Sequence, residues 1–288
     1  MPAVPADLQT LRRRLDEIDD HLQDLLIDRA EIVSLVAASK KDGNQPAFQP
    51  AREAEIIRRL ARRHRGSFPV ANLVRMWREM LAATVGLQSP FSVAVFAPPD
   101  RQGLWDLARD HYGSSTAMTP YDAADPVLRA VCGRESTVGV LPMPEPGEPD
   151  PWWPRLVSGD GKAPRIIARL PFAAHGNART DGAEALTVGF GTHQESGLDR
   201  TWLAVECTAD IARAWILKFL SAAGLVCTFF ASCNDGRLVK LIEVEGYVPV
   251  GDNRLDSLRR ALEGESCRLL PVGGYAVPLT STQLASKE

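Results

Sequence analysis

The chain has 288 residues, a formal net charge of -3 and a sequence pI near 6.0, with 45% hydrophobic and 24% charged residues. This composition is that of a globular protein, and it excludes a disordered chain or one built only of coiled coil. At about 100–200 residues per domain, the length predicts two or three domains. The charge argues against a dedicated binder of nucleic acid or of anionic membranes.

The sequence predicts a cytoplasmic protein. It has no run of 18 apolar residues, and its first ten residues lack a basic segment followed by an apolar one, so we expect neither a membrane span nor a signal peptide. The cysteines are odd in number and lack CxxC spacing, which predicts reduced thiols rather than a disulfide framework or a zinc site. They are Cys132, Cys207, Cys227, Cys233 and Cys267.

The first 90 residues have a helical pattern. Apolar residues recur every three or four positions from Leu8 to Val36, which predicts one amphipathic helix of roughly 33 residues, about 50 Å long. After a break at Asp42–Pro46, Pro50 opens a second helix through about Arg65, and a third follows over Val70–Leu87. The first helix is too long to pack within so small a unit, so we expect it to pair with a second chain.

After Pro90 the pattern changes to alternating strands and helices, which predicts an α/β layer with a parallel sheet. From about Asp199, the order β-α-β-β-α-β describes a ferredoxin-like split motif. The predicted organisation is therefore multi-domain. It comprises an all-α three-helix domain, an α/β region and an α+β ferredoxin-like domain, at residues 1–90, 91–198 and 199–288.

One charged residue interrupts the apolar seam of the first helix. Arg29 lies seven residues after Leu22 and seven before Val36, where an unpaired guanidinium would be costly. It is either a buried arginine paired with an acid of a neighbouring helix or a fork for a substrate carboxylate. Lys40, eleven residues on, faces the same way, although a lysine there also complements the helix dipole.

The remaining polar signals in this region are individually weak. Arg52 and Glu53 fall in the first turn of the second helix, where an acid ordinarily complements the dipole and an arginine is ordinarily on the surface. Thr84 and Gln88 lie four residues apart on one face of the third helix. The basic run Arg12–Arg14 is followed at once by acidic residues, which indicates a solvated face and no nucleic-acid partner.

As a set, these residues closely resemble the active-site residues of the all-helical chorismate mutase family. The resemblance covers residues 5–90, and in that family an intertwined dimer builds each site with one arginine from the partner's long helix. Gln49 stands where aspartate is common in the family, and Thr84 stands where serine is common. The matching set is Arg12, Arg29, Lys40, Gln49, Arg52, Glu53, Thr84 and Gln88.

The resemblance implies the rearrangement of chorismate to prephenate, a unimolecular reaction that needs no nucleophile, metal or cofactor. Such a reaction requires only restraint of the reactive conformer and stabilisation of charge at the ether oxygen. By resemblance, Arg12 of the partner and Arg29 would clamp the two carboxylates. Lys40 and Gln88 would donate to the ether oxygen, and Glu53 would accept from the ring hydroxyl. The residues that would shape the pocket are Gln49, Arg52 and Thr84.

The rest of the chain resembles the bifunctional chorismate mutase–prephenate dehydratases. Val93–Asp100 and Gly139–Glu145 are similar to dehydratase segments, and Gly197–Glu206 looks like the junction into the regulatory ACT domain. However, residues 91–198 are too few for a two-lobed dehydratase, and Ala183–Ala185 stands where the family has Thr-Arg-Phe. We therefore expect no dehydratase activity.

The ACT-like region also departs from its family. Ile211–Arg213 replaces Gly-Ala-Leu, and Ala231–Asn234 replaces approximately Glu-Ser-Arg-Pro, so regulation by phenylalanine is not expected. The sequence as a whole predicts a homodimeric chorismate mutase of aromatic amino acid biosynthesis with inactive dehydratase-like and ACT-like regions. Two alternatives stay open, namely a bifunctional mutase–dehydratase and a non-catalytic dimeric regulator with a ligand-sensing ACT-like domain.

Overall fold

The computed structural model of the protein describes residues 7–40, 46–157, 163–173, 176, 179, 182–234 and 236–285. The chain divides into two compact units. The first contains Met1–Ala47 and Thr84–Pro90, and the second contains Phe48–Ala83 and Phe91–Glu288. The domain boundaries at residues 90 and 198 stay predictions.

The three predicted N-terminal helices are confirmed. They are α1 (Leu8–Lys40), α2 (Pro50–Arg63) and α3 (Val70–Gln88). Asp7 caps α1, because its Oδ1 accepts the backbone N–H groups of Gln9 and Thr10 at 2.9 and 3.0 Å. Pro50 stands at the start of α2, where its missing N–H is not needed by the helix.

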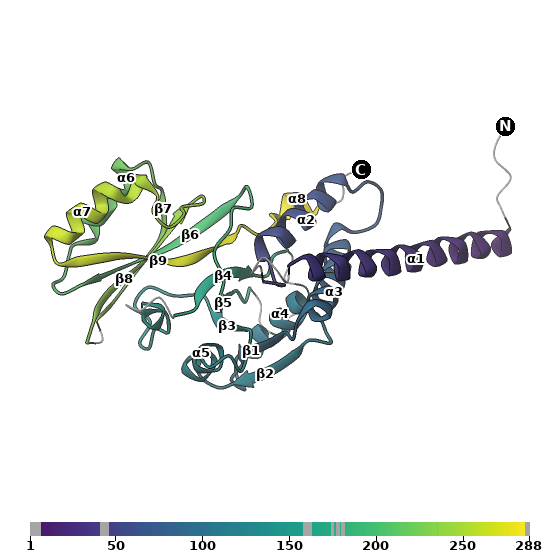
Figure 1. The fold of residues 1–288 in the computed structure, drawn as a ribbon, viewed down its shortest axis with the longest axis horizontal. Coiled ribbons are helices and arrows are strands. Elements are labelled where there is room, and N and C mark those ends of the chain that lie inside the picture. Colours follow the sequence, from purple (N-terminus) through teal and green to yellow (C-terminus); the bar gives the residue numbers. More distant parts are fainter. Residues whose placement is uncertain are drawn as a thin grey trace. The chain divides into compact units, whose positions relative to one another are not determined.

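The strands of the described chain form one nine-stranded sheet in the order β2-β1-β3-β5-β4-β9-β6-β8-β7 (Figure 1). The strands are β1 (Ser92–Phe96), β2 (Ala117–Tyr121), β3 (Val138–Pro142), β4 (Arg165–Leu170), β5 (Ala185–Gly189), β6 (Asp199–Cys207), β7 (Cys227–Asn234), β8 (Leu238–Glu245) and β9 (Cys267–Ala276). The further α-helices are α4 (Gly103–Tyr112), α5 (Ala124–Cys132), α6 (Arg213–Ala222), α7 (Asp256–Gly264) and α8 (Ser281–Leu284).

The sheet corrects the prediction of a parallel α/β layer. β1 is parallel to β2 and β3, but β5 is antiparallel to both β3 and β4. The described residues between β3 and β5 include no α-helix, and a parallel neighbour would need such a crossover. β2 was not predicted from the sequence. It contains Pro120 and is mostly exposed, as an edge strand can be.

The last four strands have the predicted β-α-β-β-α-β order, with the antiparallel neighbours β9-β6-β8-β7. Figure 1 shows α6 and α7 together on one face of these strands, where they share an apolar core with the sheet. Trp152 and Trp153, from the proline-rich stretch after β3, share a second core with Trp202 of β6. Apolar groups therefore cover both faces of this part of the sheet.

β4 and β9 join the two halves of the sheet at a glycine. Ile166 pairs with Gly273, whose φ is +122°. A Cβ at residue 273 would overlap the backbone N, C and O atoms of Ile166, so the strands can meet here only if the residue is glycine.

We expect Gly273→Ala to lower the free energy of unfolding by more than about 2 kcal/mol, because a positive φ alone costs an alanine about 1–2 kcal/mol and the overlap adds to it. Gly251→Ala is the matched control, since Gly251 has φ +86° and no atom within 4 Å of an added Cβ. Urea denaturation followed by tryptophan fluorescence measures both variants. Equal losses in the two would contradict the close approach of β4 and β9.

Candidate active site

Three of the predicted site residues lie on α1. Arg12 is exposed and Arg29 is partly buried, and burial lowers the pKa of the Arg29 guanidinium. Arg29 nevertheless remains charged at neutral pH, as arginines in proteins do. Lys40 is the last residue of α1, and its side chain lies outside the described residues.

Thr84 and Gln88 come together at the end of α3. Thr84 is buried, and its carbonyl oxygen accepts a hydrogen bond of 3.0 Å from Nε2 of Gln88. Oε1 of Gln88 is buried and has no hydrogen-bond partner among the described residues. These two residues and those of α1 belong to the first unit.

The α2 residues of the predicted set belong to the second unit. Gln49 is the N-cap residue, and its carbonyl oxygen accepts the backbone N–H of Glu53 at 3.0 Å. Arg52 is exposed and forms an ion pair of 2.8 Å with Glu55. Glu53 points inward and is buried.

Glu53 forms a buried ion pair with Arg78 of α3, whose Nη1 donates to Oε2 of Glu53 at 2.9 Å. The side chains of Arg78 and Glu53 are 6% and 11% exposed. Burial raises the pKa of Glu53 to about 7, although the charge of Arg78 opposes the rise. Burial also lowers the pKa of Arg78.

Arg78 was not among the predicted site residues. Its position carries the same signal as Arg29, because it lies between Val74 and Leu81 on the apolar face of α3. An arginine on an apolar face predicts a buried partner or ligand. For Arg78, the structure shows a buried partner, the carboxylate of Glu53.

A second arginine fastens α2 to the segments beside the sheet. The buried guanidinium of Arg58 donates to the carbonyl oxygens of Ser196, Leu198 and Val277 at 2.9, 2.8 and 2.7 Å, and to Oγ of Ser196 at 3.0 Å. These bonds hold α2 against the chain that enters β6 and the chain that leaves β9.

The position of the dehydratase family's Thr-Arg-Phe triplet lies at the start of β5. Ala183 is buried, Ala185 is the first residue of the strand, and Glu184 forms a bidentate ion pair with Arg169 at 2.8 and 2.9 Å. These three residues supply no hydroxyl group, but the lack of dehydratase activity stays a prediction.

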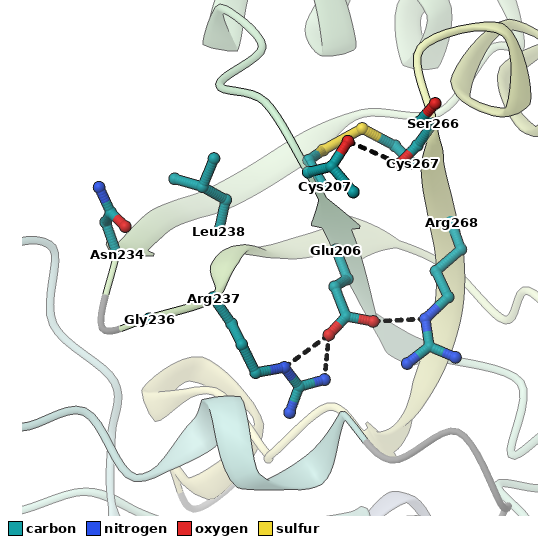
Figure 2. A pocket seen from close by; sticks show the side chains of 10 residues that line it. Glu206, Cys207, Asn234, Gly236, Arg237, Leu238, Ser266, Cys267 and Arg268 are labelled. Carbon is teal, nitrogen blue, oxygen red and sulfur yellow. Dashed lines mark hydrogen bonds and ion pairs between the residues drawn. A yellow bond between two sulfur atoms is a disulfide. The ribbon is translucent and has the colours of Figure 1, made fainter.

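An open pocket of about 710 Å³ lies at one end of β6–β9 (Figure 2). Glu206 at its centre accepts hydrogen bonds from Arg237 and Arg268, so both guanidinium groups already have a partner. None of the predicted site residues lines this pocket.

The same end of the sheet corrects the prediction of reduced thiols. Cys207 and Cys267 are opposite residues of the antiparallel strands β6 and β9, and they form a disulfide (Figure 2). They are 60 residues apart in the chain, so their spacing gave no sign of the pairing. Cys132, Cys227 and Cys233 are free.

The described part of the chain offers no candidate for a membrane-spanning helix or for a metal site. Its helices include none long and apolar enough to cross a membrane. No cluster of three or more His, Cys, Asp or Glu side chains in that part is arranged to hold a metal ion.

Comparison with known proteins gives a match in the N-terminal region and relatives of one kind. Residues 11–89 match the family described as chorismate mutase type II. A bifunctional chorismate mutase/prephenate dehydratase of Pseudomonas aeruginosa is 30% identical over 143 residues, which are 47% of this chain and 38% of that protein. One from Aquifex aeolicus is 29% identical over 141 residues, covering 48% of this chain and 39% of that protein.

The matched part therefore spans less than two fifths of these relatives' own length. Among solved structures, prephenate dehydratase from Streptococcus mutans covers 66% of this chain and 100% of its own, with 14% identity and a TM-score of 0.46. The resemblance inferred from the sequence is confirmed: residues 11–89 match the chorismate mutase type II family, and the relatives that match the chain are bifunctional chorismate mutase/prephenate dehydratases.

Proposed function

We propose that this protein is a homodimeric, cytoplasmic chorismate mutase that converts chorismate to prephenate. The observation that carries the proposal is the family match over residues 11–89, a span that includes every residue of the predicted site. The predicted roles of those residues are proposals as well.

The chemistry requires positioning and electrostatic stabilisation. Arg29 is a planar donor that suits a carboxylate, and its partial burial strengthens a charge-assisted hydrogen bond. The side-chain amide of Gln88 lies at the end of α3, and we propose that it donates a hydrogen bond to the ether oxygen of chorismate. Glu53 would accept from the ring hydroxyl, and an ionised carboxylate is the better acceptor.

The surface of α1 supports a dimer. Its large apolar side chains are exposed in the single chain, at 43–66% of their full area, and a row of this length on one helix is typical of an interface. We propose that the row packs on α1 of a second copy. It consists of Leu8, Leu11, Leu15, Ile18, Leu22, Leu25, Leu26, Ile32 and Val36.

The length of α1 supports a shared site. Arg12 and Arg29 are seventeen residues apart on one helix, which separates them by about 25 Å along its axis. Two arginines of one chain therefore cannot grip a molecule as small as chorismate. Antiparallel crossing of two α1 helices would bring Arg12 of one copy beside Arg29 of the other, giving two equivalent sites.

For the C-terminal region, we propose an ACT-like unit formed by β6–β9 with α6 and α7, and a dehydratase-like region without dehydratase activity. The disulfide and the Glu206 ion pairs then have a structural role at the end of the sheet.

Product analysis tests the proposed function. Purified protein is incubated with chorismate and, separately, with prephenate, and the products are identified by chromatography. We expect prephenate from chorismate, and no phenylpyruvate from prephenate. Phenylpyruvate formed in proportion to enzyme would favour the bifunctional enzyme, and unchanged chorismate would favour the non-catalytic regulator.

A further inference from the structure

The buried pair of Glu53 and Arg78 is closed by residues that lie beyond the mutase-like segment. Phe172, which follows β4, lies against the guanidinium of Arg78, with 4.8 Å from Cζ to the ring centroid. Phe172 is 5% exposed. It shares an apolar core with residues of α2 and α3, together with two residues that follow or end β9. The members of this core are Ala54, Ile57, Ala61, Val70, Val74, Leu81, Phe172, Ala276 and Leu279.

Almost no water reaches the Arg78 side of this pair, whereas the side chain of Glu53 is 11% exposed. The cavity beside it measures about 10 Å³, enough for one water molecule at most, and its lining includes Arg78, His111, Arg169 and Phe172. A buried charge in so dry a place requires a partner at short range. Among the described residues, Arg78 is the hydrogen-bonding cation for Glu53.

The other titratable groups near the pair carry little free charge. Burial and the charge of Arg78 hold the pKa of His111 well below its usual range, so its imidazole is neutral. Tyr112 donates to Thr187 at 2.8 Å, and burial raises its pKa, so it is neutral as well. The charge of Arg169 is engaged by Glu184.

We propose that Arg78 is a positioning residue for Glu53, and that Phe172 of the C-terminal region completes the arrangement by closing the Arg78 side of the pair off from water, with Oε1 of Glu53 left to accept the substrate hydroxyl. The proposal rests on the proposed function, in which Glu53 binds the substrate hydroxyl. It gives the dehydratase-like region a task in the mutase, because the carboxylate acts in surroundings that residues 1–90 do not provide alone.

The two groups act on Glu53 in opposite directions. The positive charge of Arg78 favours the ionised carboxylate, whereas the exclusion of water by Phe172 favours the protonated one. Because the ionised form is the better acceptor, kcat/KM should rise with pH along an acid limb with its midpoint near the Glu53 pKa of about 7.

Three substitutions separate these effects. Arg78→Met removes the charge and should move the midpoint to higher pH by at least about one unit. Phe172→Ala admits water and should move it to lower pH, toward the usual range of a carboxyl group. Arg78→Lys keeps the charge and should stay within about half a unit of wild type.

Arg75→Met is the matched control, because Arg75 lies one turn before Arg78 on α3 and pairs with Asp110. It should not move the midpoint. A general loss of stability would lower the melting temperature of any of these variants but would not shift the limb in opposite directions. If Arg78→Met does not fold, two results still test the proposal. The midpoint should move to lower pH in Phe172→Ala and stay unchanged in Arg78→Lys.

Two readouts keep this proposal apart from the proposed function. The first is the pH profile of kcat/KM with chorismate. The second is the carbon-13 titration of the Glu53 carboxyl group in full-length protein labelled with carboxyl-13C glutamate, assigned with Glu53→Gln, which needs no turnover. Opposite shifts in both readouts are expected. Midpoints unchanged in Arg78→Met and Phe172→Ala would overturn the proposal, whereas shifts in the resonance without any turnover of chorismate would overturn the proposed function instead.

Discussion

Arg29→Ala is expected to lower kcat/KM for chorismate by about 10²–10³-fold, the usual cost of losing one preorganised charged contact. Arg29 is partly buried on the apolar seam of α1, where its guanidinium is incompletely hydrated, and alanine cannot replace the bidentate contact with a carboxylate that we propose for it. The variant should remain folded and dimeric, because alanine at a seam position favours both the helix and its apolar contacts.

Arg13→Ala is the matched control for Arg29. Arg13 is exposed on the opposite face of the same helix, where its guanidinium contacts only Thr10 among the described residues. Steady-state kinetics with analytical ultracentrifugation measures activity and assembly together. If Arg29→Ala keeps wild-type turnover, Arg29 is not a residue of the site. Its other interpretation, a buried structural arginine, is then favoured.

Arg58→Ala is expected to lower the free energy of unfolding by about 3–5 kcal/mol. The substitution removes a hydrogen-bond donor from three backbone carbonyl oxygens and from the hydroxyl of Ser196, in a place where Arg58 itself is 8% exposed. It also removes the guanidinium that lies 5.6 Å from the Phe172 ring centroid. Chemical denaturation measures the loss.

Arg59→Ala is the control for Arg58, because its side chain is the next on α2 and is exposed. It should change stability by less than about 0.5 kcal/mol. If Arg58→Ala and Arg59→Ala lose equal stability, the hydrogen bonds of Arg58 do not hold α2 to the segments beside the sheet. The C-terminal region would then not support this helix through Arg58.

The helices could be predicted from the sequence because their signals are local. The apolar period of α1 and the proline that opens α2 act within a few residues, and both gave the correct elements. The β-α-β-β-α-β order after Asp199 also follows from local pattern. The direction of β5 does not, because strand pairing depends on connections through the proline-rich stretch that carry no periodic signal.

The site was predictable only as a set of residue types. Thr84 and Gln88 were predicted to share one face of the third helix, and Nε2 of Gln88 donates to the carbonyl oxygen of Thr84. The partner of Glu53 was missed because Arg78 lies 25 residues further along the chain, on another helix. Phe172 could not be predicted at all, since its contact with Arg78 arises from tertiary packing. The disulfide was missed for the same reason.

Subunit complementation tests whether Arg12 and Arg29 of different chains build one site. Arg12→Ala and Arg29→Ala proteins are mixed under conditions that exchange subunits, with exchange verified by mass-tagged chains. In a mixed dimer with shared sites, one site carries both substitutions and the other carries neither, because the Arg29→Ala chain lends its intact Arg12 to the partner's intact Arg29.

Each parent protein should be almost inactive. At random pairing half of the dimers are mixed, and each has one intact site of two, so the mixture should recover roughly a quarter of wild-type mutase activity. A mixture no more active than its parents, despite verified exchange, would contradict a chorismate mutase site built from Arg12 of one chain and Arg29 of the other.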